Sequence, residues 1–412
     1  MDKKFLKNSF SLYILAFTKL VIPFLTLPYL TRVLSVETYG IIAYVKSLMG
    51  YVQLIIDFGF MLFATREIAD ARKEDDWTII SSVVSTATVT RIFLGLIAFF
   101  FISVLTFSTP MLRDHLLYVV LMFLSVFLTI FWMDFLFSGI EKMEVLSYRF
   151  LSSKILTTLL ILIIIKSDKD IVLMGFIEIA GTLVASFFTF FELFKLKIKI
   201  IVPSFSSCYR MLYHSFLYFF SNFATSAFGL LITFLIGLNL QASDVAYWSL
   251  ALQLVGGIQS FYSPILDALY PAMIRNFRIK LVLKVLCIVM PVIFLGCIII
   301  KIFCIDILKI IAGDKYVYSA QVLIYLIPVL IISFPAMLFG WPYLGALGQV
   351  RLVTMSSIFA SVGQVVMLFT LILTNNFNLY FICITRCIAE FLLFFFRFIF
   401  SIYVTKKEYG SV

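Results

Sequence analysis

The stretch that decides the fold is residues 116–137, LLYVVLMFLSVFLTIFWMDFLF, in which Asp134 is the single charged residue. At about 1.5 Å per residue, a helix of this length crosses a hydrocarbon core of about 30 Å. The segment shows no alternation of polar and apolar residues, which argues against a transmembrane β-strand. A membrane-spanning helix is expected instead, because a helix satisfies its own backbone hydrogen bonds in lipid.

Similar apolar segments recur from one end of the 412-residue chain to the other. Apolar residues make up 63% of the chain, charged residues 13%, and the mean hydropathy is +1.10. Because so few polar side chains cannot cover the surface of a water-soluble protein, the sequence predicts an all-α integral membrane protein. Twelve spans are predicted, near residues 9–34, 39–65, 77–106, 115–138, 145–165, 171–194, 210–239, 245–272, 281–303, 317–340, 351–373 and 377–404.

Positive charge is distributed unevenly between the two sides of these spans. The chain has 32 Lys and Arg against 22 Asp and Glu, a net charge of +10. Nineteen of the basic residues, Arg149 among them, fall at the chain ends or in the loops of one side, and seven fall in the loops of the other. The positive-inside rule then places both termini in the cytoplasm. The positive excess is assigned to topology, not to nucleic-acid binding, and MDKKFLKNSF is interpreted as the start of a retained first span.

A basic stretch at residues 195–210, KLKIKIIVPSFSSCYR, divides the chain nearly in half. We expect an N-terminal six-helix bundle at 1–194, a cytoplasmic linker at 195–209 and a C-terminal bundle at 210–412, as in transporters that hold a substrate between two halves. Glu37 before Tyr39 and Asp244 before Tyr247 follow the first span of each half, a likeness too weak to establish a repeat. No predicted loop exceeds about fifteen residues, which leaves no room for a separate catalytic domain.

Residue types able to hold a metal or a cofactor are scarce. The six Cys lie in or beside apolar segments without metal-binding spacing, and His115 and His214 are the only histidines. We therefore predict no metal, no cofactor and no catalytic residue. A membrane enzyme such as a polymerase or an acyltransferase would be expected to show long loops or a catalytic His/Asp motif, and a channel a repeated pore loop, and the sequence has none of these.

Six basic residues fall inside the predicted spans, where each would cost several kcal/mol to bury in lipid. They are Lys19, Lys46, Arg91, Lys154, Arg386 and Arg397. Lys46 and Arg91 come out about 20 Å above the cytoplasmic ends of their spans, level with Glu178. Lys19 and Lys154 lie lower, near mid-bilayer, and Asp57 shares the level of Lys19. Because the first half holds four of the six, we expect a cationic cavity wall there, suited to an anionic substrate such as a phosphate.

These charges give two sets of candidate residues. Lys19, Lys46, Arg91 and Lys154 are candidate substrate-binding residues. Asp57, Asp134, Glu178 and Glu390 are candidate ion-coupling or proton-coupling residues. A structural alternative stays open, in which the basic residues pair with these carboxylates or extend to an interface. Arg386 and Glu390 form an i,i+4 pair on one helix face.

Prolines predict kinks in three of the spans. Pro23 and Pro28 interrupt the first span and Pro264 and Pro271 the eighth. Pro328, Pro335 and Pro342 punctuate the tenth span and its exit. In a transporter, a kinked first span can bend to close one side of a cavity, although proline in membrane helices is common.

Several short motifs keep a fixed order along the chain: PYLTRVLSVETYG at 28–40, DFGF at 57–60, WMDFLFSGIEKM at 132–143, ALYP at 268–271 and GDKY at 313–316. In this order they resemble the Wzx-type polysaccharide flippases, where a Gln commonly stands at the position of Ser138. The resemblance implies the MATE-like fold of the multidrug/oligosaccharidyl-lipid/polysaccharide exporters, two six-helix bundles forming a V around a central cavity.

The resemblance also implies an activity, that of a transporter and not an enzyme. The expected cargo is an undecaprenyl-diphosphate-linked oligosaccharide, an O-antigen or capsule repeat unit, moved by alternating access from the cytoplasmic to the periplasmic leaflet of a bacterial inner membrane. Lys19, Lys46 and Arg91 would engage the diphosphate. Membrane lipids are the other expected partner and a monomer the expected state, while association with the polysaccharide polymerase and chain-length regulator is left open. The alternative within the same fold is an ion-coupled drug or metabolite exporter, against which the basic first half argues.

Overall fold

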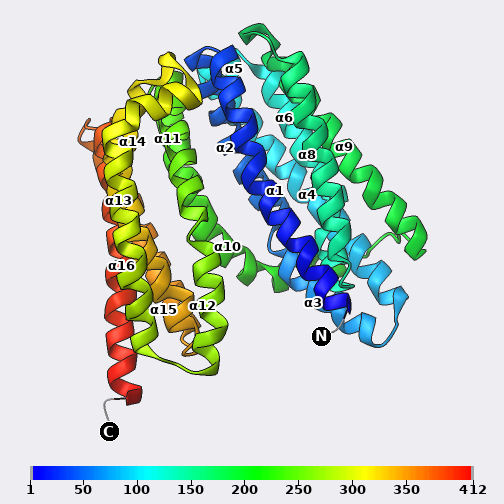
Figure 1. Cartoon of the computed structure of the whole chain (residues 1–412). Helices are drawn as coiled ribbons and strands as arrows, with labels where there is room; N and C mark the ends of the chain where they lie inside the picture. Colours follow the sequence, from blue (N-terminus) through cyan, green and yellow to red (C-terminus); the bar gives the residue numbers. More distant parts are fainter. Residues whose placement is uncertain (1–2, 410–412) are drawn as a thin grey trace. The chain divides into compact units, whose positions relative to one another are not determined.

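The computed structural model describes residues 3–409, and within them the side chains at 3–10, 12–14, 20, 217, 221–222, 224–228 and 408–409 are not described. The predicted cytoplasmic chain ends concern residues 1–2 and 410–412, outside this range. Every regular element in the described part is a helix (Figure 1). The chain forms two compact units, residues 1–234 and 235–412. This division falls inside helix α10, and the boundaries expected at 194 and 210 stay a prediction.

The first unit contains helices α1 to α9 and most of α10. Their bounds are α1 Lys3–Val33, α2 Val36–Asp57, α3 Phe60–Lys73, α4 Trp77–Ser108, α5 Pro110–Arg113, α6 Leu116–Leu128, η1 Thr129–Trp132, α7 Asp134–Gly139, α8 Met143–Ile164, η2 Asp168–Asp170, α9 Ile171–Leu196 and α10 Phe205–Asn239. The second unit contains α11 Ala242–Ser260, α12 Ser263–Arg275, α13 Ile279–Ala312, η3 Asp314–Tyr316, α14 Tyr318–Leu338, the π-helix η4 Phe339–Gly345, α15 Val350–Leu373 and α16 Leu379–Tyr409.

Nine helical segments in the described part are long and apolar enough to cross a membrane. They coincide with the second to sixth and the ninth to twelfth predicted spans. The three other predicted spans overlap α1, α10, and α11 together with α12. The expected all-α, multi-pass membrane fold is therefore confirmed, whereas the count of twelve spans stays a prediction.

Capping side chains explain where several helices begin. Ser35 accepts a hydrogen bond from the backbone N–H of Thr38 at the start of α2, at 3.2 Å. Gln241 and Asp244 form a capping box at the start of α11. Glu37 and Asp244 each lie in the first turn of their helix, where a carboxylate is favoured by the helix dipole. The faint likeness between the two halves therefore reflects an acidic residue in the first turn of each helix.

The end of α1 and the start of α2 are hydrogen-bonded to the segment between α8 and α9. Tyr29 donates a hydrogen bond to the carbonyl of Ile165 at 2.7 Å, and Asp168 accepts one from the backbone N–H of Ser35 at 2.7 Å. Pro23 and Pro28 lie inside α1, which continues past both. Pro264 does mark a break, because α11 ends at Ser260 and α12 begins at Ser263 with proline in its first turn.

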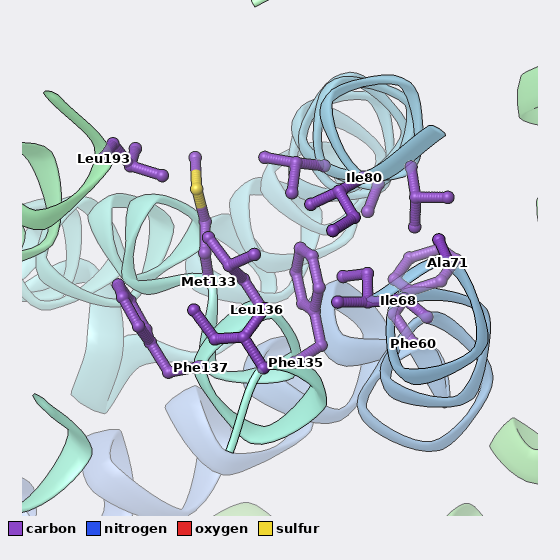
Figure 2. Close-up of a cluster of buried hydrophobic side chains, with 14 of the residues drawn as sticks. Phe60, Ile68, Ala71, Ile80, Met133, Phe135, Leu136, Phe137 and Leu193 are labelled. Atoms are coloured by element: carbon purple, nitrogen blue, oxygen red, sulfur yellow. The ribbon is translucent and has the colours of Figure 1, made fainter. Parts of the chain in front are cut away.

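A buried apolar core joins α3, α4, α7 and α9 in the first unit (Figure 2). Phe60 and Ile68 come from α3, Ile80 from α4, Phe135 from α7 and Leu193 from α9, and all are less than one-tenth exposed. The core therefore fixes the short helix α7 and the start of α3, which follow the two helix breaks described next.

Candidate functional site

Two helix breaks lie close together in the first unit. The chain leaves α2 through Phe58 and Gly59, whose φ angles are +36° and +75°. It leaves η1 through Met133, whose φ angle is +51°, before α7 begins. Because a helix end leaves carbonyl groups without intrahelical partners, breaks at membrane depth need bonding partners from neighbouring side chains.

Gly59 allows helix α10 to pass directly against the first break. A Cβ at this position would lie 2.7 Å from the backbone nitrogen of Phe219 and 2.9 Å from the carbonyl oxygen of Ser215. The ring of Phe58 stacks on that of Phe219 with centroids 4.4 Å apart. The DFGF motif is thus a helix break with a second helix docked on it, and only glycine combines the positive φ with this close approach.

Arg91 of α4 holds the two breaks together. Its guanidinium bonds Asp57 at the end of α2 at 2.6 Å and donates to the carbonyl of Ile130 in η1 at 3.1 Å. Arg91 is 5% exposed. Asp57 was expected level with Lys19, but it bonds Arg91. The reason is that helical side chains tilt toward the helix N-terminus, which lowers the long Arg91 side chain toward Asp57. Gln53 completes the contact by donating to Asp57 at 2.9 Å.

Arg149 of α8 stabilises the second break as Arg91 stabilises the first. It pairs with Asp134, donates to the carbonyl of Trp132, and donates to Thr189 at 3.0 Å. Its side chain is 3% exposed. The count of cytoplasmic loop charges included Arg149, and that assignment is wrong, because its guanidinium is buried against the rings of Trp132 and Phe137.

A cavity of about 150 Å³ lies at these breaks, and we call it the break pocket. Its lining is Gln53, Asp57, Phe60, Met61, Arg91, Thr129, Trp132, Asp134 and Phe135. The side chains of Asp57 and Asp134 are each 45% exposed, although their arginine partners are buried. The pocket therefore exposes two carboxylates whose negative charges are neutralised by buried arginines.

A second group of charges joins α2, α8 and α9, and we call Lys46, Lys154 and Glu178 the lysine cluster. Lys154 and Glu178 approach to 3.4 Å between Nζ and Oε2, and both are electrostatic neighbours of Lys46. Lys46 is exposed, and the Lys154 side chain is 30% exposed. Two positive charges thus share one carboxylate, and both lysines remain accessible. Glu178 lies near Lys46 as the helix-depth argument predicted, but it pairs with Lys154, which that argument placed lower.

Lys19 of α1 extends the lysine cluster along α8. Its Nζ lies over the ring of Phe150 at 5.5 Å, and its side chain is exposed. Phe150 precedes Lys154 by one helical turn, so the two share a face of α8. Figure 1 shows α1 in blue lying along α8, in agreement with their extensive packing. The three lysines therefore line one side of the first unit.

The second unit uses its interior charges to hold a helix break. Arg397 of α16 is 9% exposed, donates to the carbonyl of Ala336 at 2.8 Å and packs against Gly340, where the backbone is not helical. Arg386 and Glu390 form the predicted i,i+4 pair at 2.8 Å. Each of the four candidate coupling carboxylates is thus ion-paired: Asp57, Asp134, Glu178 and Glu390.

Sequence reasoning missed Gln53, Thr129, Trp132 and Arg149 as parts of this site. DFGF carried a signal for the first break, since a glycine two residues after an aspartate inside an apolar run is unusual. Met133 carried none, because methionine is an ordinary helix residue. Within the described part, no group of three or more His, Cys, Asp or Glu could hold a metal.

The family model described as "Polysaccharide biosynthesis protein" matches residues 5–277. The chain belongs to this polysaccharide biosynthesis protein family. A relative from Escherichia coli (strain K12), named "Putative O-antigen transporter", is 26% identical over 64% of this chain and 64% of its own length, just under two thirds. A Shigella dysenteriae protein of the same name is 23% identical over 78% of this chain and 82% of its own.

Solved structures show the fold of this family member. A multidrug resistance MATE family transporter of the MOP superfamily, in its inward-facing conformation, is 13% identical and matches with a TM-score of 0.71 over 94% of this chain and 96% of its own. A MOP superfamily transporter from Pyrococcus furiosus, 13% identical, gives 0.58 over 96% of each chain. The predicted MATE-like fold is confirmed. The family match and the names of the two relatives agree with the resemblance to polysaccharide flippases.

Proposed function

We propose that this protein is a flippase for an undecaprenyl-diphosphate-linked oligosaccharide. It would move an O-antigen or capsule repeat unit from the cytoplasmic to the periplasmic leaflet by alternating access, with both chain termini in the cytoplasm. The family and the two O-antigen transporter relatives support the cargo class. The observation that carries the proposal is the lysine cluster, with its surplus of accessible positive charge.

A diphosphate is a suitable ligand for the lysine cluster. Its negative charge cannot enter a low-dielectric layer without compensating charge, which Lys46 and Lys154 supply. The Lys154–Glu178 contact is long at 3.4 Å, so an incoming phosphate oxygen can replace it. Lys19 extends the positively charged surface toward α1. Lysine suits this task because it binds phosphate as a mobile point charge.

Arg91 has a different part in this proposal. Its guanidinium is already bonded to Asp57 and Ile130, so it positions the two breaks and does not reach for the diphosphate. Arg91 competes with any cation for Asp57, so an ion would bind there more readily once the arginine moves away. Ion or proton coupling through Asp57, Asp134, Glu178 or Glu390 would therefore be favoured when one of these ion pairs opens.

Complementation tests the proposal. The chain is expressed in a bacterium that lacks its own O-unit flippase but carries the cognate glycan genes, and surface polysaccharide is scored on a gel. Wild type should restore the polysaccharide, whereas Lys46→Ala/Lys154→Ala should not at equal membrane abundance. Lys280→Ala/Lys284→Ala is the matched control, since it removes two exposed lysines from α13 and should still complement.

Two results would contradict the proposal. Full complementation by the Lys46→Ala/Lys154→Ala variant would remove the lysine cluster from the mechanism. Failure of the wild type with the cognate genes present, together with increased resistance to cationic drugs, would favour the exporter alternative.

A further inference from the structure

We infer that the break pocket binds one sugar ring of the cargo through the hydroxyl groups of that ring. This inference rests on the proposed function and adds to it a site for the glycan, separate from the diphosphate site. It is carried by the polar lining of the pocket, by its aromatic lining, and by its position along α2 relative to Lys46.

The polar lining offers both acceptors and a donor. Asp57 and Asp134 present half-exposed carboxylates, and Gln53 and Thr129 line the same pocket, joined by a hydrogen bond of 3.1 Å. Gln53 adds an amide N–H, because its bond to Asp57 uses only one of the two hydrogens on Nε2. A sugar hydroxyl fits this lining because it donates to a carboxylate and accepts from the amide at the same time.

The charge balance of the break pocket disfavours ionic ligands. Arg91 and Arg149 neutralise the two carboxylates, so a metal cation or a cationic drug meets little net attraction. A phosphate would meet Asp57 and Asp134 before reaching either buried guanidinium. A neutral ligand rich in hydroxyl groups avoids both costs.

The aromatic lining and the size fit a single ring. Trp132, which is partly exposed, supplies an apolar face against which the C–H face of a sugar can pack, and the buried side chains of Phe60 and Phe135 complete the apolar lining. A few placed polar groups among apolar side chains are typical of small-molecule sites. The volume of about 150 Å³ is below that of drug-sized sites, so the pocket holds one ring and not a whole oligosaccharide.

The break pocket is also at a suitable distance from the lysine cluster. Lys46 and Gln53 lie seven residues apart on the continuous helix α2, so they share one face, about 10 Å apart along the axis. A diphosphate at Lys46 would therefore place the sugars attached to it near Gln53. The order of the two sites along α2 therefore matches the order of the diphosphate and the sugars in the cargo.

Binding to the full chain in nanodiscs tests the inference with two probes. One is undecaprenyl diphosphate, and the other is undecaprenyl diphosphate carrying N-acetylglucosamine. Met61→Trp fills the pocket from its rim, and Leu62→Trp is the matched control, because Leu62 is exposed on α3 and does not line the pocket.

We expect wild type to bind the sugar-bearing probe about tenfold more tightly, which corresponds to about 1.4 kcal/mol. Met61→Trp should abolish this difference and leave the affinity for undecaprenyl diphosphate unchanged, and Leu62→Trp should keep the difference. Lys46→Ala/Lys154→Ala should weaken binding of both probes.

Equal affinity of wild type for the two probes, or a difference that survives Met61→Trp, would overturn the sugar site. The proposed function would stand in that case if the lysine variant still weakened both probes, and it would fail if the lysine variant bound both normally. A preference for the sugar-bearing probe that appears only with sodium present would assign the pocket to a cation and overturn the inference.

Discussion

The arginines at the helix breaks and the lysines of the lysine cluster lie in the same unit, but their bonding differs. Arg91 and Arg149 are nearly inaccessible, and each bonds a carboxylate and a freed backbone carbonyl. Lys46 is exposed, and Lys154 has one long contact with Glu178. The difference separates charges that maintain the fold from charges available to a ligand.

The chemistry of the two side chains explains this division. A guanidinium presents five donors in a rigid fork, so it can satisfy a carboxylate and a carbonyl together where a helix is broken. An ammonium on a flexible stem makes fewer directed bonds and can exchange its partner. Arg397 in the second unit follows the arginine pattern, because it too bonds a carbonyl beside a break.

The largest expected effect comes from removing an arginine at a break. Arg149→Leu leaves the carbonyl of Trp132 and the carboxylate of Asp134 without their partner, and it should destabilise the fold by about 3–5 kcal/mol. Arg149→Lys should restore only part of this. Thermal unfolding in detergent measures the change, and Lys46→Ala should leave the unfolding temperature unaltered. Equal stability of Arg149→Leu and wild type would refute the structural role.

Gly59→Ala should have the next largest effect. The added Cβ meets backbone atoms of α10, and alanine is strained at a φ of +75°, so a loss of about 1–3 kcal/mol is expected. Gly256→Ala is the matched control, since nothing lies within 4 Å of a Cβ built there. If the two variants unfolded at the same temperature, the close docking of α10 on the break would be wrong.

Hydropathy alone located the helices, because twenty or so apolar residues in lipid have no alternative to a helix. It could not locate the breaks, which depend on single residues at positive φ such as Met133. The Arg386–Glu390 pair was predictable because it lies within one helix. The Arg91–Asp57 pair was not, since it depends on how α4 packs on α2 and which way a long side chain extends.

For the lysine cluster, we expect charge to matter more than shape. Lys46→Arg/Lys154→Arg should keep most of the complementing activity, whereas the double alanine variant should lose at least about tenfold, because either cation attracts a diphosphate. The measurement is surface polysaccharide relative to membrane-inserted protein. If the arginine variant failed as completely as the alanine variant, simple electrostatic attraction would not explain the cluster.

The smallest effect is expected for Lys19. It lies over Phe150 at the edge of the lysine cluster, so Lys19→Ala should reduce complementation only a few-fold and leave thermal stability unchanged. Lys19→Arg should match wild type. A loss as severe as that of Lys46→Ala/Lys154→Ala would move the centre of the diphosphate site toward α1.

The lysines of the lysine cluster bind the cargo, whereas the arginines at the helix breaks stabilise the fold. Proteoliposomes test this division most directly, by following the movement of undecaprenyl diphosphate between leaflets with wild type and with Lys46→Ala/Lys154→Ala matched for unfolding temperature. The account predicts that the variant is folded but at least about tenfold slower. A folded variant that moves the lipid at the wild-type rate would contradict it.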